Sequence, residues 1–502
     1  MKMKKILITL VAGLLLTACT EGLLDLKNPN LLTTDTYWET KDDVMSAFAA
    51  TYSLLRDVNG GYWGVRGVEL TNGRGDDFFI RNDVKDLYQF STFTNAPDNG
   101  VVTNIFNNCY RGIFRCNQIL ENIAEIPMSE EERAQLIAEA KFLRGLNYFH
   151  LVINFGDVPV RLQTPQSQEE YYAAKSPAEE VWQQVFQDFS EAKAGLPLEY
   201  PAEWTGRATR GAALGYLGKA YLYHEDWDKA EAAFSELMQA PYQYDLTADY
   251  ADNFTAEREN NEESVFEIQV QDVGGTNPWD VGSSNEALGV TTAQEFAPAE
   301  VAGWFEAYPT DKIFNAFQEE KTPGGDFDKR MYVTLVWDYP GAMYYNRPFS
   351  EFKSEFGFQS RFRKYQNWQN DNEGRFISNI NERALRFADI LLMYAEAVTM
   401  QGKPQEAYEP VNRIRQRAGL SVLPAGFGEA QMMAEIQQQR MLEFCREGLR
   451  FYDLRRWGLL QEEIMSSDKV GRQFLNVQKH AWFPIPQAEL DNNPEMEQNP
   501  NW

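Results

Sequence analysis

The chain has 502 residues, of which 43% are apolar and 24% charged, and this balance excludes intrinsic disorder as its main state. Lysine and arginine total 47 and aspartate and glutamate total 74, so the net charge is −27. Such a surface repels phosphate backbones and anionic headgroups, which excludes nucleic-acid binding and electrostatic docking on an anionic membrane. Three His and four Cys are too few and too scattered for a zinc site of standard spacing or for a disulfide framework. The length is typical of about two to four domains, although one large domain also fits it.

The first nineteen residues have the composition of an export signal. Three lysines among the first five residues precede an apolar run, residues 6–16, which is too short to cross a bilayer. The run ends in Leu-Thr-Ala-Cys, and the small residues before Cys19 look like the lipobox of a bacterial lipoprotein. We therefore expect cleavage after residue 18 and acylation of Cys19, and several acyl chains would make a stable anchor. The alternative is an ordinary signal peptide with an incidental cysteine. No later stretch has the apolar length of a transmembrane helix.

Apolar periodicity predicts a series of helices along the first half of the chain. Ser129 and Glu132 form a capping-box pattern at the start of one of them. Cys109 and Cys116 lie seven residues apart in another and are expected in its buried core. Gly- and Asn-rich sequence around residues 59–64 and 72–75 indicates loops. The helices are expected over about residues 41–55, 102–123 and 129–153, and from Ser176-Pro177 onward.

A repeat pattern follows these helices. Residues 217–234 read Leu-Gly-x2-Tyr, eight residues, Ala-x3-Phe, which matches the tetratricopeptide spacing. Residues 394–411 read Tyr-Ala-x2-Val, eight residues, Ala-x3-Val, a degenerate copy in the same register. Small residues let two antiparallel helices approach closely while apolar residues fill the groove between them. The spacing therefore predicts at least two helical hairpins.

The stretch from about residue 249 to 368 has a different character. Residues 264–270 alternate like a half-buried strand, and residues 332–337 are expected to form another strand. Long irregular segments rich in Gly, Pro, Asn and aromatic residues lie around them. Long irregular insertions in a compact protein are usually functional loops. The sequence thus predicts a helical scaffold interrupted by a loop-rich half.

Several motifs together resemble one family. Residues 386–397 read RFADILLMYAEA, residues 440–457 read RMLEFCREGLRFYDLRRW, and residues 483–487 read FPIPQ. With the lipobox, Gly-Asp-Val-Pro at 156–159 and Gly-Arg-Ala-Thr at 206–209, the chain closely resembles the SusD/RagB family of Bacteroidetes outer-membrane lipoproteins. The resemblance extends over nearly the whole chain after the signal.

The resemblance implies a fold, an activity and partners. The fold would be mainly α, with tetratricopeptide-like hairpins holding a variable binding half and a few short strands. The activity would be binding a nutrient at the cell surface, most often an oligosaccharide, and delivering it to a SusC-like TonB-dependent transporter. No cofactor or metal is implied. The expected organisation is a signal peptide (1–18), a lipidated tether (19–30) and one SusD-like domain (31–502), with scaffold at about 31–60, 102–240 and 381–460 and the binding half at about 61–101 and 249–380.

The charged pattern Arg440, Glu443, Glu447 and Arg450 has two interpretations. Its spacing of 3, 4 and 3 places all four residues on one helix face. A glycoside hydrolase needs one protonated and one ionised carboxyl group, roughly 5–5.5 Å apart in a retaining enzyme. Here each Glu has an Arg three residues away, which favours ionisation of both. We therefore expect a structural set of ion pairs and no catalytic chemistry.

Two further sets of candidate residues give weaker signals. His150, His224 and His480 are far apart and lack triad companions, so packed histidines are expected. The run Asn-Gly-Arg-Gly-Asp-Asp at 72–77 lacks the ligand rhythm of an EF-hand, although a bound cation in this loop stays open.

Aromatic residues in loops are the main positive signal for ligand binding. They make up 14% of the chain, and flat rings match the apolar faces of sugars while polar neighbours bind hydroxyl groups. An aromatic next to Gly or Asn is expected to be more exposed than one at helical spacing, so Trp182, Trp227, Trp304 and Trp457 are expected in the core. The candidate ligand-binding residues are Tyr62, Trp63, Asp76, Trp279, Trp337, Tyr339, Tyr344, Tyr345 and Trp368.

The sequence therefore predicts a lipid-anchored, surface-exposed outer-membrane protein that binds an oligosaccharide and changes no bond in it. One alternative is a peptide-binding member of the same family, and others are a secreted glycoside hydrolase and a structural envelope protein.

Overall fold

The computed structural model describes residues 37–502 except 58–59, 68–71, 272–289, 353–358 and 375–377. Cys19, the signal and the whole of the tether (19–30) lie outside the described residues, as does Trp279. Within the described ranges, no helix combines the length and the apolar character needed to cross a bilayer.

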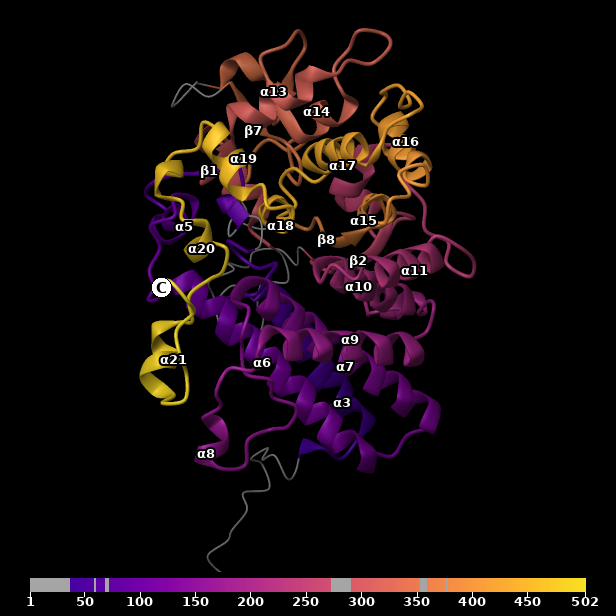
Figure 1. Cartoon of the computed structure of the whole chain (residues 1–502), viewed down its shortest axis with the longest axis vertical. Coiled ribbons are helices and arrows are strands. Elements are labelled where there is room, and N and C mark those ends of the chain that lie inside the picture. Colours follow the sequence, from indigo (N-terminus) through magenta and orange to yellow (C-terminus); the bar gives the residue numbers. More distant parts are fainter. Residues whose placement is uncertain (1–36, 58–59, 68–71, 272–289, 353–358, 375–377) are drawn as a thin grey trace, which may run out of the picture.

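Helices dominate the described part of the chain, which confirms the mainly α class (Figure 1). The four helices expected in the first half are present within two residues of their predicted bounds, and Ser129 caps α7 in a capping box with Glu132. Cys109 and Cys116 are buried in α6, as expected. The α-helices are α3 Lys41–Ser53, α5 Lys85–Ser91, α6 Gly100–Asn122, α7 Glu130–Phe155, α8 Gln168–Tyr171, α9 Ala178–Gly195, α10 Arg210–Tyr223, α11 Trp227–Leu237, α12 Thr292–Phe296, α13 Asp311–Glu319, α14 Lys329–Thr334, α15 Phe387–Met400, α16 Tyr408–Arg417, α17 Glu429–Glu443, α18 Arg450–Arg456, α19 Leu460–Ser466, α20 Val477–His480 and α21 Gln487–Asn492.

The long helices stack in sequence order into one scaffold. Helix α7 packs between α6 and α9, α10 packs on α9 and α11, and α15 packs on α11, α16 and α17 (Figure 1). One large apolar cluster runs through these layers and includes residues from Val44 in α3 to Met496 after α21. Helix α7 is buried along nearly all of its C-terminal half, because it has neighbours on more than one side.

The two repeat patterns form helical hairpins, as predicted. The first is α10–α11 and the second is α15–α16. Gly218 shows why the spacing needs a small residue: a Cβ there would lie 2.5 Å from the ring of Phe234. The consensus Gly therefore sets the distance between the two helices of the first hairpin.

Small antiparallel sheets occupy the loop-rich half. The described strands are β1 Phe78–Ile80, β2 Ser264–Ile268, β3 Ala307–Pro309, β4 Leu335–Trp337, β5 Met343–Tyr344, β6 Arg347–Pro348, β7 Ser360–Phe362 and β8 Glu382–Arg386. They pair as β1–β3, β2–β8, β4–β7 and β5–β6. The strand expected at 264–270 is β2. The strand expected at 332–337 was half wrong: residues 329–334 form α14, because the Asp328 side chain caps it by accepting from the Arg330 N–H at 2.8 Å, and only residues 335–337 are extended.

Ion pairs buried at the end of α17 join this half to the scaffold. Glu443 accepts from Arg386 of β8 at 3.0 Å and from Arg330 of α14 at 3.3 Å, and it also pairs with Arg417 of α16. Burial by itself would raise the pKa of Glu443, but these guanidinium groups lower it to about 2. Glu443 is therefore an ionised structural residue, as the sequence predicted.

The remaining residues of that charged pattern also form ion pairs, but they do not share one helix. Arg440 bonds Asp389 and Asp453, Glu447 bonds Lys364 and Arg386, and Arg450 bonds Asp76. Helix α17 ends at Glu443, and the chain turns through positive φ at Arg446 and Gly448 before α18. The prediction that all four residues share one helix face was therefore wrong, and the prediction of ion pairs is confirmed.

Gly218→Ala is expected to destabilise the protein by about 1–3 kcal/mol, because the added methyl group must displace the Phe234 ring. Gly428→Ala is the matched control, because a Cβ there meets nothing within 4 Å. Chemical denaturation of both variants measures the difference. Equal stability of the two variants would contradict the packing described for the first hairpin.

Glu443→Gln is expected to cost about 3–5 kcal/mol of unfolding free energy, because it leaves three buried guanidinium groups without their shared carboxylate. Glu462→Gln, an exposed change on α19, controls for the loss of one negative charge. A loss no larger than that of Glu462→Gln would show that the buried pairs do not join the two halves.

Candidate functional site

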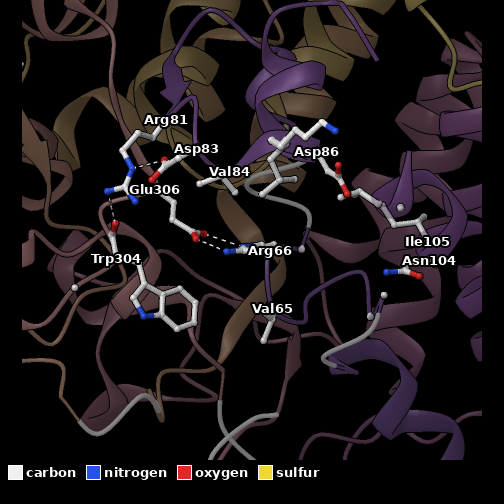
Figure 2. Close-up of a pocket in the computed structure, with 18 of the residues that line it drawn as sticks. Val65, Arg66, Arg81, Asp83, Val84, Asp86, Asn104, Ile105, Trp304 and Glu306 are labelled. Atoms are coloured by element: carbon white, nitrogen blue, oxygen red, sulfur yellow. Dashed lines mark hydrogen bonds and ion pairs between the residues drawn. The ribbon is translucent and has the colours of Figure 1, made fainter. Parts of the chain in front are cut away.

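A cavity with a volume of about 930 Å³ opens in the loop-rich half. Four segments line it: the loop around Gly60–Gly67, the turn and helix start at residues 81–87, the start of α6, and the loop at residues 299–306 (Figure 2). Its volume lies within the range of about 300–1,000 Å³ that is usual for small-ligand sites. Its position matches the region in which the sequence predicted ligand binding.

Trp304 is the aromatic residue of this lining, and Arg81 holds its loop. The Arg81 guanidinium donates to the Trp304 carbonyl oxygen at 2.7 Å and to the Asp83 carboxylate at 2.5 Å. The Arg81 backbone N–H donates to the Glu306 carbonyl at 2.8 Å, which continues the pairing of β1 with β3. The indole is half-buried and lies on the cavity wall below Glu306 in the view of Figure 2. The loop that carries the ring is therefore fixed before any ligand arrives.

Arg66 and Glu306 form the second fixed feature. The Arg66 Nε–H donates to Glu306 Oε2 at 2.9 Å, and its Nη2 bonds the other oxygen of the carboxylate (Figure 2). The hydrogen bond with Glu306 raises the pKa of Arg66 against the effect of burial. The guanidinium carbon lies 6.0 Å from the centre of the Trp304 ring. Because this pair is already formed, it offers a ligand hydrogen-bonding groups but no unpaired charge.

Glu295 does not line the cavity but is a buried titratable group bonded to the backbone of Arg66. It accepts from the Arg66 backbone N–H at 2.9 Å and from the Thr291 hydroxyl at 2.6 Å. Burial, together with the nearby charge of Glu306, raises the pKa of Glu295 to about 7. The proton on Glu295 thus affects the charge next to the Arg66–Glu306 pair near neutral pH.

The charges of the lining balance. It contains three cations and three anions, namely Arg66, Arg81 and Lys85, and Asp83, Asp86 and Glu306. Hydrogen bonding to Arg81 lowers the pKa of Asp83, so this carboxylate is not a proton donor. Among the described residues, no three or more His, Cys, Asp or Glu side chains are grouped to hold a metal ion. The arrangement suits a neutral molecule with many hydroxyl groups, one face of which packs on an indole ring.

The loop in which Tyr62 and Trp63 were expected to bind ligand contributes to the cavity lining, but not through these two side chains. Tyr62 and Trp63 are only 6% and 7% exposed. Tyr62 stacks on His150 at 3.6 Å between ring centres and donates to or accepts from the Tyr452 hydroxyl at 2.8 Å, and Trp63 packs edge-on to the same histidine. Their expected exposure was wrong, because both rings turn inward onto α7 while the neighbouring backbone lines the cavity.

Three candidate aromatics of β4 and β5 and the turn after them are also buried, contrary to expectation. Trp337 packs among Phe314 and Phe327, and Tyr344 and Tyr345 are fully covered. The Tyr344 hydroxyl donates to the Phe362 carbonyl at 2.8 Å, and the Tyr345 hydroxyl donates to Glu373. Each ring therefore fills a small core within the loop-rich half.

The remaining described candidates have different environments. Tyr339 and Trp368 are half-buried, and Trp368 lies under the Arg363 guanidinium at 3.5 Å. Neither lines the cavity. Asp76 is fully buried between Arg450 and Lys312, at 2.7 Å from each, and these cations lower its pKa despite its burial. Asp76 is thus a structural residue, which corrects its assignment to ligand binding.

Trp304 is the residue that the sequence analysis missed. It was expected in the core, yet it lines the cavity. Its position directly after Gly303, in an irregular stretch, was the signal that had been used for the other loop aromatics. Trp182, Trp227 and Trp457 were also expected in the core and are half-buried.

Comparison with known proteins now identifies the family. A family model described as "SusD family" matches residues 262–502, and one described as "Starch-binding associating with outer membrane" matches residues 24–222. The crystal structure of a SusD superfamily protein from Bacteroides vulgatus is 36% identical, covers 93% of this chain and 100% of its own, and has a TM-score of 0.85. A structure described as a laminarin binding SusD-like protein is 25% identical, with coverage of 93% and 100% and a TM-score of 0.79. SusD-like protein P2 of Formosa agariphila is 27% identical over the full length of both chains.

The chain therefore belongs to the SusD family, as its motifs predicted. The family comprises starch- and glycan-binding proteins associated with the outer membrane, as the descriptions of the second family model and of the relatives state.

Glu295→Gln is expected to remove a pH dependence of stability. Because the folded-state pKa of about 7 lies above the ordinary value of 4.5, Glu295 stabilises the fold when protonated, and this contribution is lost as the pH rises from about 4.5 through 7. The variant should therefore match the wild type near pH 5 and exceed it at pH 8 by up to roughly 3 kcal/mol. Denaturation at both pH values measures this, with Glu319→Gln on the surface of α13 as control. Parallel stability curves for wild type and Glu295→Gln would refute the assignment.

Proposed function

We propose that this protein binds a neutral oligosaccharide in the Trp304 cavity, at the outer-membrane surface, and changes no bond in it. The observation that carries this proposal is one indole ring on the wall of a 930 Å³ cavity whose charged lining residues balance. The indole supplies an apolar face for a sugar ring, and the charged and amide edges around it supply donors and acceptors for hydroxyl groups. The family, whose members include starch-binding proteins and a laminarin binding SusD-like protein, supports the same ligand class.

A neutral ligand is favoured over a charged one by the pairing inside the cavity. Arg66 is bonded to Glu306 and Arg81 to Asp83, so two of the three cations of the lining offer no unpaired charge to a sulfate or a uronate. A cationic peptide would likewise meet two carboxylates, Asp83 and Glu306, that already have partners. Peptide binding is therefore the second candidate, to be tested with the same variants.

A hydrolase is not favoured, because neither Asp83 nor Glu306 of the described lining is free to act as an acid, and Glu295, whose pKa burial raises to about 7, does not line the cavity. Asp83 is held as a carboxylate by Arg81, and Glu306 is held in two bonds by Arg66. A glycosidase needs one of its two carboxyl groups free to donate a proton to the leaving oxygen.

Lipid anchoring at Cys19 and delivery to a SusC-like TonB-dependent transporter complete the proposal. The lipobox sequence supports the anchor, and the family resemblance supports the transporter. In this role the protein holds the ligand and releases it unchanged, which fits a preformed site without reactive groups.

Trp304→Ala is expected to weaken oligosaccharide binding by about 10- to 30-fold, the usual effect of removing a central aromatic contact. Calorimetric titration with a panel of neutral hexaoses, including laminarihexaose and maltohexaose, measures the change. Trp368→Ala is the matched control, because this half-buried loop tryptophan lies outside the cavity, and Trp304→Phe should restore part of the affinity.

Loss of affinity in Trp368→Ala but not in Trp304→Ala would place the ligand elsewhere. Binding of a peptide panel with no binding of any hexaose would favour the second candidate. Release of shorter sugars from any hexaose would contradict the proposed absence of chemistry.

A further inference from the structure

A second groove, of about 390 Å³, lies on the helical scaffold. Its walls are the loop at residues 198–209 between α9 and α10, the loop at residues 241–244 after α11, and residues 260–267, which lead into β2. Helix α10 and strand β2 lie side by side in Figure 1. We call it the Tyr242 groove. It shares no lining residue with the Trp304 cavity, so it is a separate site.

One wall of the Tyr242 groove carries two nearly parallel rings. Tyr242 and Tyr244 have ring centres 6.4 Å apart and planes 14° apart, and Tyr244 stacks in turn on Phe387. Gly211 makes room for the inner ring, because a Cβ there would lie 2.1 Å from the Tyr244 hydroxyl oxygen. The inner tyrosine is thus wedged against the scaffold and supports Tyr242, which is half-exposed. This is a flat aromatic surface whose orientation is fixed in advance.

The loop between α9 and α10 carries more aromatic surface, which Arg207 holds in place. The Arg207 guanidinium lies 4.7 Å from the ring centre of Tyr200 and 5.3 Å from that of Trp204. Its Nε–H donates to the buried carboxylate of Glu139 at 2.9 Å. Trp204, which directly precedes the lining residue Thr205, is 43% exposed. An exposed indole on a loop that an ion pair anchors needs little ordering when a ligand binds.

Side-chain amides form the polar part of the groove. Asn260 and Gln269 exchange two amide hydrogen bonds of 3.1 and 3.0 Å, and Asn261 donates to the Arg258 carbonyl at 2.9 Å. Gln243, which lies between the two tyrosines in the sequence, is exposed. Amides carry both donors and acceptors, as sugar hydroxyl groups do.

The charge of the groove selects against anions. Its lining contains three carboxylates, Glu199, Glu262 and Glu267, and one cation, Arg207, which is already bonded to Glu139. Sulfated or uronate-containing sugars would be repelled, and a neutral sugar would not.

We propose that the Tyr242 groove is a second carbohydrate-binding site, which holds a neutral stretch of glycan on the Tyr242 ring, with the exposed Trp204 indole, beside the lining residue Thr205, extending the aromatic surface at its edge. The volume lies in the range for small-ligand sites, and the combination of fixed rings, amides and no unpaired cation suits a neutral sugar. Two sites on one chain raise the effective affinity for a polysaccharide that reaches both, because the second contact becomes intramolecular.

Hydrogen–deuterium exchange of the full chain, with each neutral hexaose of the panel in turn, tests the site directly. Peptides covering residues 199–207 and 241–244 should become protected, independently of those covering residues 81–87 and 299–306. Protection of the groove should persist in Trp304→Ala. An oligomer of uronic acid, as the anionic probe, should protect neither segment of the groove.

The double variant Trp204→Ala/Tyr242→Ala should lose the groove protection and keep that of the Trp304 cavity. It should bind an immobilised neutral polysaccharide at least tenfold more weakly than the wild type, with unchanged affinity for a hexaose at the cavity. Tyr171→Ala/Phe474→Ala, which removes two exposed rings elsewhere, is the matched control and should behave like the wild type.

If no neutral hexaose of the panel protects the groove, this proposal is overturned, whatever happens at the Trp304 cavity. Protection of the groove by added peptide ligands, but by no sugar, also overturns the proposal. Protection of the groove alone would support it and would instead contradict the cavity assigned under the proposed function.

Discussion

The buried ion pairs around Glu443 are the interaction on which the rest of the structure depends. They bring together the ends of α17 and α16, strand β8 and the loop-rich half through Arg330. Lys364 strengthens the same junction, since its ammonium group donates to Glu447 at 2.5 Å, to the Tyr250 hydroxyl at 2.7 Å and to two backbone carbonyls. Removing charges from water is costly, so such a cluster is stable only when every member has its partners. The ion pairs therefore favour the one arrangement of the loop-rich half on the hairpins in which every charged group has its partner.

That arrangement places the walls of the Trp304 cavity. Strand β3 carries the end of the 299–306 loop onto β1, and β1 leads into the turn that holds Arg81. The scaffold side of the cavity comes from the start of α6, which packs on α7. A rigid helical frame and a docked set of loops together give a site that exists without its ligand, and preformed sites lose less entropy on binding.

The helical part of this fold was predictable because its signals are local. The capping box at Ser129 and the Gly218–Phe234 contact depend on residues near one another in sequence, and the structure has both. Residues 332–334 show the limit: they were predicted to begin a strand, but they end the short helix that the Asp328 side chain caps. Tertiary contacts and caps override propensity in short segments.

The binding residues were less predictable, because the direction of a ring is a tertiary property. A Gly-rich context predicted exposed rings at Tyr62 and Trp63, yet Tyr62 stacks on His150 and Trp63 packs edge-on to it, almost ninety positions away in the sequence. Arg66, three residues on, points into the cavity and pairs with Glu306, a partner that no local pattern indicates. Trp304 shows the converse, because its ring was assigned to the core and lies on the cavity wall.

The central claim is that a preformed cavity with Trp304 on its wall holds a neutral oligosaccharide and leaves it intact. A crystal structure of the protein grown with the tightest-binding neutral hexaose tests this most directly. The account predicts an unbroken sugar chain with one ring stacked on the Trp304 indole and hydroxyl groups bonded to the Arg66–Glu306 pair. A sugar bound elsewhere with the Trp304 cavity empty, or a cleaved sugar within the cavity, would contradict the account.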